Sequence, residues 1–415
     1  MNTDFNRVML CLSIEVTRKC DMNCSFCSRG PAQNLNITHE VIDRTINEMK
    51  HFFACGLRLH GGEPLLAYEE IHYLFSKIIE YRIPISYIVV FTNGFIKDER
   101  YFNLVRMMLA YIREIEAEYP EVVNIKNHTE INEIYNVTSQ KKIVFIASSY
   151  GHDNKPNYKD TLDFYNQGIS DSDFIIIEQY APENSTLVLE GNAKKNIREL
   201  LGDMVDPSRI RTIGSGYYFI GKSKSNSNRS IINKTITVSA NGNVFSGCST
   251  SYANADEKPM FNVLDCNGNM WDKIENYCWE HPISIENKKF RETYEAVKLC
   301  KQNGIIINGF ENYDFNLEEL IYTLAISNER IARTLHHTYK ALSPQDIIGL
   351  SLMVQCLNLL ESENTDKDVV KDILKQYIKA TTDIKEDEKL KVFLDIESLK
   401  ILIENVTKLN TILEK

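Results

Sequence analysis

Three cysteines fall within eight residues, in the stretch Cys20-Asp-Met-Asn-Cys24-Ser-Phe-Cys27, directly after the apolar run from Val8 to Val16. This spacing allows three thiolates to converge on one metal centre from a single loop. A structural zinc site needs four closed ligands, usually in paired C-x2-C units, and no such pair lies nearby. A cubane iron–sulfur cluster has four irons, so three cysteines leave one iron open to an external molecule. Three reduced, inert thiols are the plain alternative.

The bulk properties of the chain favour a large soluble protein. Its 415 residues are enough for two or three domains. The net charge of −10 does not favour nucleic-acid binding, and no apolar run is long enough to span a bilayer. The first residues lack the layout of a signal peptide. We therefore expect a cytoplasmic protein without membrane or nucleic-acid partners, whose ten cysteines ligate metal or stay reduced.

Apolar strand patterns alternate with helical patterns along the first half of the chain. A helix is expected after the N-cap Thr38 and should stop at Gly56. The expected strands cover residues 8–16, 57–60, 86–91, 142–147, 174–177 and 209–213. Such alternation predicts a parallel sheet with right-handed crossovers, whose chemistry lies at the carboxyl ends of the strands. Periodicity alone leaves a barrel and a doubly wound sheet equally open.

The segments after the predicted strands are polar and glycine-rich. They include Gly61-Gly62-Glu63-Pro64, Thr92-Asn93-Gly94, Ser148-Ser149-Tyr150-Gly151 and Glu178-Gln179. Each segment on its own also fits an ordinary turn. Their recurrence behind the cysteine loop favours one shared site.

The cysteine loop resembles the C-x3-C-x2-C signature of the radical SAM superfamily. Phe26 fits this resemblance, because the family usually has an aromatic residue before the third cysteine. The resemblance implies an α/β fold with a partial (β/α)6 TIM-like barrel over residues 1–222. It also implies a [4Fe–4S] cluster on Cys20, Cys24 and Cys27, whose open iron binds S-adenosylmethionine. An electron from the cluster then cleaves the sulfonium to methionine and a 5'-deoxyadenosyl radical.

The segment from Gly61 to Pro64 matches the GGEP motif of the same family. The resemblance implies that it holds the methionyl amino group of the cofactor. Glycines let backbone carbonyls approach that group, and Pro64 fixes the exit of the turn. Glu63 would add negative charge beside the sulfonium.

Three further residues are carried over to cofactor binding at the strand ends. Asn93 belongs to a TNG segment like that of many relatives. Ser148 matches the serine of the family's S-x-D-G segment, although Tyr150 stands where the Asp is usual. Glu178 is expected to face the same cavity.

Two basic residues near these segments have open roles. Arg29 could meet the cofactor carboxylate or a substrate anion. His60 could donate a proton or bind substrate, and a structural role is favoured over both. No residue is assigned to catalysis.

The segment 223–285 resembles a SPASM or twitch extension of peptide-modifying relatives. Asn241-Gly242 between two β-rich runs predicts a hairpin over residues 235–248, and Gly221–Ser230 before it reads as a linker or a mobile lid. The family pattern has one residue fewer before its cysteine, here Cys248, and its later C-x2-C-x5-C run is missing. A cluster on Cys248, Cys266, Cys278 and Cys300 is possible, but no second cluster is expected. Residues 286–415 read as a helical C-terminal domain.

The resemblance implies an enzyme that takes hydrogen from a substrate. The hairpin favours a peptide or protein, and a small molecule or nucleotide is the alternative. A non-catalytic iron–sulfur or redox-sensing scaffold is the alternative of another class. An enzyme of this kind needs an electron donor such as a flavodoxin or ferredoxin.

Overall fold

The computed structural model describes residues 4–120, 141–150, 158–181, 186–206, 209–212, 222–224, 230–247, 251–280 and 295–308. Contacts divide the chain into two compact units. The first comprises Met1–Asn196 with Ser215–Pro282, and the second comprises Ile197–Gly214 with Ile283–Lys415. The cysteine loop and the predicted hairpin both belong to the first unit.

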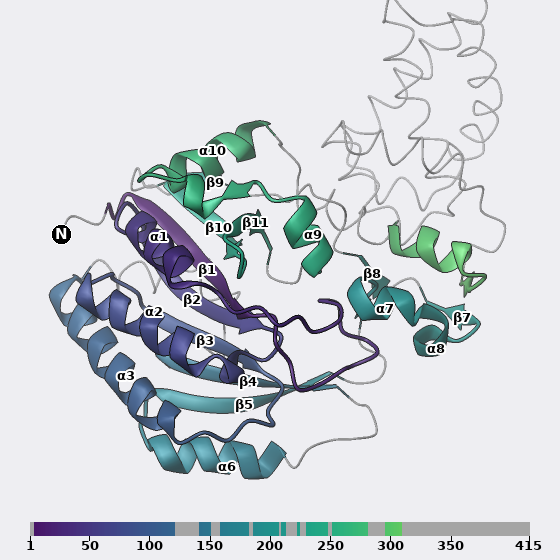
Figure 1. Ribbon diagram of the computed structural model, residues 1–415, viewed down its shortest axis with the longest axis horizontal. Helices are drawn as coiled ribbons and strands as arrows, with labels where there is room; N and C mark the ends of the chain where they lie inside the picture. Colours follow the sequence, from purple (N-terminus) through teal and green to yellow (C-terminus); the bar gives the residue numbers. More distant parts are fainter. Residues whose placement is uncertain are drawn as a thin grey trace, which may run out of the picture. The chain divides into compact units, whose positions relative to one another are not determined.

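A nine-stranded sheet forms the centre of the first unit (Figure 1). Its path is β12-β11-β10-β1-β2-β3-β4-β5, and β9 pairs with β10 off this path. The run from β10 to β5 is parallel, as a radical SAM partial barrel requires. These parallel strands are β10 (Ser230–Val238), β1 (Arg7–Thr17), β2 (Phe53–Gly61), β3 (Tyr87–Thr92), β4 (Ile143–Tyr150) and β5 (Phe174–Ala181).

Helices connect the parallel strands and lie along one face of the sheet (Figure 1). They are α1 (His39–Met49), α2 (Tyr68–Glu80), α3 (Arg100–Glu118) and α6 (Tyr158–Ile169), with the short η1 (Pro64–Leu66) before α2. The hydroxyl of Thr38 accepts the N–H of Val41, so the predicted N-cap of α1 is confirmed. The alternating strands and helices are therefore the α/β fold expected from the sequence.

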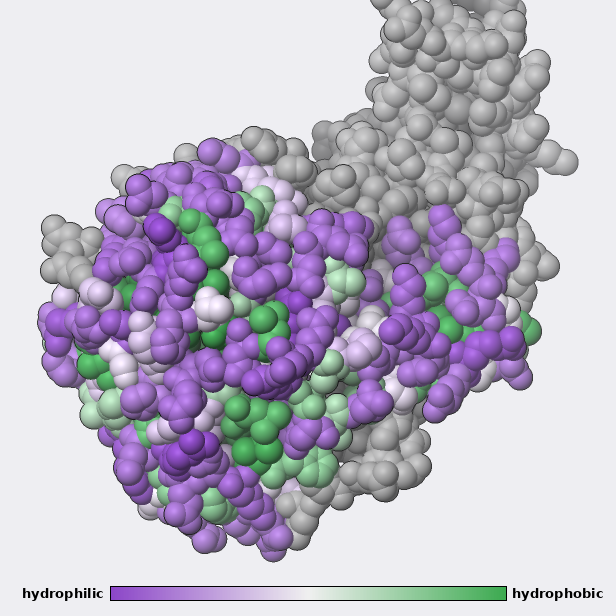
Figure 2. All heavy atoms as spheres, in the orientation of Figure 1, coloured by the Kyte–Doolittle hydropathy of each residue, from purple (hydrophilic) through white to green (hydrophobic). Residues whose placement is uncertain are grey.

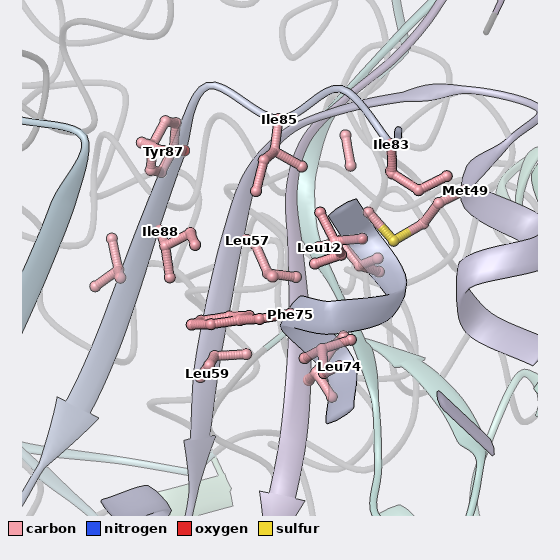
Figure 3. Close-up of a cluster of buried hydrophobic side chains, with 14 of the residues drawn as sticks. Leu12, Met49, Leu57, Leu59, Leu74, Phe75, Ile83, Ile85, Tyr87 and Ile88 are labelled. Carbon is pink, nitrogen blue, oxygen red and sulfur yellow. The ribbon is translucent and has the colours of Figure 1, made fainter. Parts of the chain in front are cut away.

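The core lies between these helices and the sheet. Leu74 and Phe75 of α2 pack against Leu57 and Leu59 of β2 and against Leu12 of β1 (Figure 3). All five are at most 3% exposed. Burial of a side chain of this size contributes about 1.5–3 kcal/mol, so this interface is a main source of stability for the barrel.

The opposite face of the sheet is polar on its first strands. Neighbouring strands align Ser13 with Arg58 and Glu15 with His60, and Ser13 also pairs with Thr237 of β10. Side chains alternate along a strand, so these five share one face while Leu12, Leu57 and Leu59 share the other. The polar face therefore contains charged groups directly beneath the segments expected to bind cofactor.

Gly56 does not end the first helix, as the sequence suggested. The helix α1 stops at Met49, and Gly56 lies inside β2, which begins at Phe53. The ring of Tyr87 from β3 covers Gly56, and a Cβ at this position would lie 2.1 Å from Cζ of that ring. The glycine is thus explained by packing between strands, a long-range contact that sequence pattern does not reveal.

The sixth parallel strand also differs from the expected one. Residues 209–213 were expected to supply it, but β8 (Ile210–Arg211) lies outside the main sheet and belongs to the second unit. The sixth parallel strand is instead β10, which pairs with β1 from Arg7 to Ile14, at the end of the parallel run opposite β5. The segment expected as a separate extension therefore shares both the sheet and the compact unit of the barrel.

The predicted hairpin is confirmed. β10 runs antiparallel to β11 (Asn243–Ser246), and β11 runs antiparallel to β12 (Phe261–Asn262). The preceding 222–224 is strand β9 (Lys222–Lys224), which pairs with the start of β10 on the edge that faces away from β1, so this part of the expected linker is ordered structure. The helices α9 (Tyr252–Glu257) and α10 (Met270–Glu280) and the turn η3 (Val263–Asp265) complete the segment.

A buried carboxylate joins this segment to the barrel. Glu48 of α1 is 1% exposed and accepts the N–H groups of Gly268, at 2.7 Å, and Met270, at 2.8 Å. These donors lie at the N-terminus of α10, where backbone N–H groups otherwise have no partner. The carboxylate therefore fixes α10 to the barrel.

The second unit is described only in part. It contains α8 (Ile197–Leu201), a helical stretch over 295–302, and β7 (Met204–Val205) paired in parallel with β13 (Ile306–Ile307). Most of the expected helical domain 286–415 lies outside the described residues. Within the residues described, none of the helices has the length and apolar character that a membrane crossing needs. The visible surface of the described part is mostly hydrophilic, with scattered apolar patches (Figure 2).

We expect Glu48→Ala to lower the free energy of unfolding by about 1–3 kcal/mol, because two buried N–H groups lose their acceptor. Urea unfolding followed by circular dichroism measures this loss. Glu40→Ala, on an exposed position of the same helix, should cost less than about 1 kcal/mol. Equal effects of the two substitutions would contradict the role assigned to Glu48.

Candidate active site

The cysteine loop leaves the carboxyl end of β1 and closes on itself at its base. The N–H of Arg18 donates to the carbonyl of Leu35 at 2.8 Å, and the N–H of Gln33 donates back to the carbonyl of Arg18 at 2.9 Å. The hydroxyl of Thr17 donates to Oδ1 of Asn36 at 2.7 Å. These bonds make the loop a closed unit that starts where the strand ends.

The three cysteines of the loop differ in burial from the other cysteines described. Cys20, Cys24 and Cys27 are partly exposed, whereas Cys11, Cys55, Cys266 and Cys300 are buried. Burial first, and then the neighbouring Cys27 and Cys20, raise the pKa of Cys24 to about 11. Burial also raises the pKa of Cys20. Without a metal these groups are thiols, and a bound cation would have to displace their protons.

The GGEP segment packs directly on the first residues of the cysteine loop. The N–H of Gly62 donates to the carbonyl of Thr17 at 2.9 Å, and the N–H of Glu63 donates to the carbonyl of Lys19 at 2.7 Å. A Cβ at Gly61 would lie 2.0 Å from the Thr17 oxygen, and one at Gly62 would lie 2.2 Å from the Lys19 oxygen. The glycines are therefore required by the close approach of two backbones within the chain.

Glu63 is fully buried and binds protein groups with both of its oxygens. Its Oε1 accepts from the N–H of Leu65 at 2.9 Å and from the hydroxyl of Thr92 at 2.8 Å. Its Oε2 accepts the N–H of Asn93 at 2.6 Å. Burial raises the pKa of Glu63 to about 7, although these bonds oppose the shift. In this arrangement the carboxylate joins the loop after β2 to the loop after β3.

Asn93 links this pair of loops to the cysteine loop. Its side-chain amide donates to Oδ1 of Asp21 at 2.7 Å. Asp21 directly follows Cys20, so the loop after β3 holds the start of the cysteine triplet. Three segments from three strand ends thus meet around the cysteines.

The remaining residues predicted from the strand ends do not all share one face. Ser148 pairs with Gln179 and Ala147 pairs with Glu178. Ser148 and Gln179 therefore lie on the face of His60, and Glu178 lies on the face of the helices. Phe26 is half-buried in the cysteine loop, and Pro64 is buried at the start of η1. Cys248 and the side chain of Cys278 lie outside the described residues.

A buried carboxylate under the loop holds both arginines that flank the cysteines. Glu15, fully buried, accepts from Nε of Arg18 at 2.9 Å and from Nη2 of Arg29 at 2.5 Å. Arg29 also donates to Nδ1 of His60 at 2.9 Å. Because a guanidinium only donates, Nδ1 of His60 is the acceptor and the proton lies on Nε2. Burial first, and then Arg29 and Arg58, lower the pKa of His60 well below its usual value, so the ring is neutral.

Arg29 is therefore part of an internal network and not an exposed anion site. Helix α9 closes this network from the other side. Asp256 forms a bidentate pair with Arg18, with both distances 2.8 Å. The ring centre of Tyr252 lies 4.9 Å from Cζ of Arg18 and 5.4 Å from Cζ of Arg29. The backbone N–H of Tyr252 donates to the carbonyl of Arg29 at 3.0 Å. Both ends of the cysteine loop are thus held by the same short helix.

Residues 14–114 match the family model described as the Radical SAM superfamily. This part of the chain is therefore a radical SAM domain. The match covers the cysteine loop, the GGEP segment and Asn93, which the structure brings together. A search among curated proteins finds no match.

Three solved structures illustrate the distant likeness of this chain to known proteins. BtrN in an open conformation is 14% identical with a TM-score of 0.31, over 68% of this chain and 87% of that one. The native anSMEcpe with bound AdoMet and Cp18Cys peptide is 15% identical with a TM-score of 0.34, over 71% and 89%. Streptococcus suis SuiB bound to precursor peptide SuiA is 12% identical with a TM-score of 0.33, over 63% and 64%. Likeness at this level does not bear on substrate.

The donor set of the loop fits the cluster that radical SAM enzymes use. Three partly exposed thiols on one loop provide thiolate ligands and leave a fourth position without a cysteine from that loop. In the part of the chain that the structure describes, no three His, Cys, Asp or Glu side chains are arranged to hold a single metal ion. In a cubane each cysteine binds a different iron, so the three sulfurs need not meet at one atom.

Sequence reasoning missed the residues that support this radical SAM site. Glu15 carried a signal, because a carboxylate inside a buried strand needs partners and two arginines follow within 14 residues. Asp256 and Tyr252 gave no such signal in the sequence, since they lie more than 200 residues from the loop. Only the fold reveals that they contact it.

We expect the free energy of unfolding to depend on the ionisation of Glu63. Its pKa is raised from 4.5 to about 7, so between these pH values the folded protein keeps a proton that the unfolded chain releases. Stability therefore falls as the pH rises through this window. Glu63→Gln removes this term, so wild type should lose about 2–4 kcal/mol relative to the variant between pH 4.5 and 7. Urea unfolding of the metal-free proteins at several pH values measures it, and parallel profiles would contradict it.

Proposed function

We propose that this enzyme cleaves S-adenosylmethionine reductively at a [4Fe–4S] cluster and uses the resulting radical to take hydrogen from a peptide or protein substrate. The cluster would supply one electron to the sulfonium, giving methionine and a 5'-deoxyadenosyl radical that becomes 5'-deoxyadenosine on accepting the hydrogen. The electron would come from a flavodoxin or ferredoxin. The reaction would take place in the cytoplasm.

One observation carries the cofactor part of this proposal. The backbone of Gly62 and Glu63 is bonded to Thr17 and Lys19, the residues that lead into Cys20. The segment expected to hold the methionyl amino group is therefore fixed beside the segment expected to hold the cluster. A cofactor that bridges the two needs this fixed spacing.

The chain's own residues have separate tasks in this reading. Cys20, Cys24 and Cys27 would hold the cluster. The backbone carbonyls of the Gly61–Gly62 segment would accept the cationic amino group. Glu63 would keep the two loops together, because its oxygens are already bonded to protein donors.

The substrate class rests on the segment after the barrel. Its hairpin and the following Asn262-Val263-Leu264-Asp265 have the order of the extension in peptide-modifying relatives. The strand β10 lies beside β1, and α9 contacts the arginines at both ends of the cysteine loop. Leu66 and Phe95, after the GGEP and TNG segments, are 41% and 38% exposed and offer apolar contacts to a peptide side chain. These features support a large substrate reaching the site from the extension.

We expect anaerobic reconstitution to give the broad absorbance of a thiolate-bound cluster near ~400 nm and about four irons per chain. Replacing Cys20, Cys24 and Cys27 together by Ala should abolish both, and should also abolish 5'-deoxyadenosine formation after reduction with dithionite. Cys300→Ala, a buried cysteine of the second unit, is the matched control and should keep the cluster. A triple variant that keeps all of the wild-type iron would refute the site, whereas a fall from about eight irons in the wild type to about four in the variant would reveal a second cluster.

We expect deuterium to pass from a peptide into 5'-deoxyadenosine. Peptides encoded beside the gene, synthesised with deuterated side chains and α-carbons, are the direct probes, and mass spectrometry of the nucleoside is the readout. A parallel panel of deuterated metabolites and nucleosides tests the other substrate class. Transfer from that panel alone would exclude the peptide reading while leaving the radical chemistry intact.

A further inference from the structure

A short helix that comes late in the sequence of the first unit is hydrogen-bonded to the cysteine loop. Asn192 and Asn196 belong to α7 (Gly191–Lys195) and its C-cap, more than 160 residues beyond the loop. We propose that these two asparagines are positioning residues, which hold the Cys24–Cys27 turn in the conformation that receives the cluster. This inference rests on the proposed cluster site.

Three hydrogen bonds join the helix to three carbonyls of the turn. The N–H of Asn192 donates to the carbonyl of Cys27 at 2.8 Å, and its side-chain amide donates to the carbonyl of Cys24 at 3.1 Å. The side-chain amide of Asn196 donates to the carbonyl of Ser25 at 3.0 Å. Within the turn, the N–H of Cys27 also donates to the carbonyl of Cys24 at 3.2 Å. Two of the three cluster cysteines therefore have their main chain fixed from outside the loop.

The helix and the loop approach as closely as two backbones can. Gly191 has a positive φ of 54°, and a Cβ there would lie 2.3 Å from the nitrogen of Gly30. Asn192 is only 8% exposed, so its amide needs protein partners and finds one in the loop. The contact is thus built into the chain at several adjacent positions.

The effect of such a contact is preorganisation. A loop that carries three metal ligands loses conformational freedom when it binds a cluster, and that cost lowers affinity. Bonds that order the turn during folding remove part of this cost before any iron arrives. The asparagines would therefore affect how firmly the cluster is held, without touching it.

The first test needs no cluster. Asn192→Ala and Asn196→Ala each remove one side-chain donor, while the backbone N–H of residue 192 remains. Hydrogen–deuterium exchange of the metal-free protein should become about fivefold faster in the peptide covering 24–30, and about 20-fold faster in the double variant. Exchange in β1 should stay unchanged, because a general loss of stability would raise both.

The second test measures retention of the cluster. Transfer of iron from the reconstituted protein to an excess of chelator should be faster by similar factors in the same variants. Asn303→Ala is the matched control, because its amide donates to the backbone carbonyl of Leu299 at 2.8 Å in the second unit. Asn192→Asp is isosteric without the donor and should release iron at least as fast as Asn192→Ala, because its carboxylate would face the carbonyl of Cys24.

The outcomes separate this inference from the cluster assignment. Wild-type protein that takes up no cluster on reconstitution would refute the site itself. Wild-type protein that loads normally, with loop exchange and iron release equal in wild type, control and both asparagine variants, would overturn the positioning role alone.

Discussion

The site depends on backbone contact between two loops that leave neighbouring parallel strands. Gly61 and Gly62 lie so close to the carbonyls of Thr17 and Lys19 that no side chain fits between them. The main chain after β2 therefore cannot move relative to the start of the cysteine loop without breaking two hydrogen bonds. Everything else around the cysteines, including the bonds of Glu63 to the loop after β3, builds on this fixed spacing.

A second level of support comes from charges that water does not reach. Glu15 is enclosed between Arg18 and Arg29, and a carboxylate in such a place is stable only while its partners remain. Asp256 and Tyr252 complete the coordination of these arginines from α9. The hairpin segment is therefore joined to the site by ion pairs as well as by strand pairing. Substitutions in α9 would weaken the contacts that hold the cysteine loop.

The sequence predicted those features that are local along the chain. The cysteine spacing, the GGEP segment and the Asn-Gly hairpin each lie within a few residues, so their chemistry is visible before folding. The contacts of Asp256 with Arg18 and of Asn192 with Cys24 join residues 238 and 168 positions apart, and no local pattern encodes them. Gly56 was misread for the same reason, since the Tyr87 ring that requires it comes from another strand. The sixth parallel strand was also misassigned, because the pairing of β10 with β1 joins segments more than 200 residues apart.

The place of β10 has a consequence for how the chain folds during synthesis. β1 leaves the ribosome long before β10, one of its two neighbours in the sheet, which comes more than 200 residues later. Until then β1 presents an unpaired edge, and the arginines beside Glu15 lack Asp256 and Tyr252. Such long-range pairing is slow, and it exposes the growing chain to aggregation. The contacts of α9 with the ends of the cysteine loop can thus form only after the hairpin segment has been made.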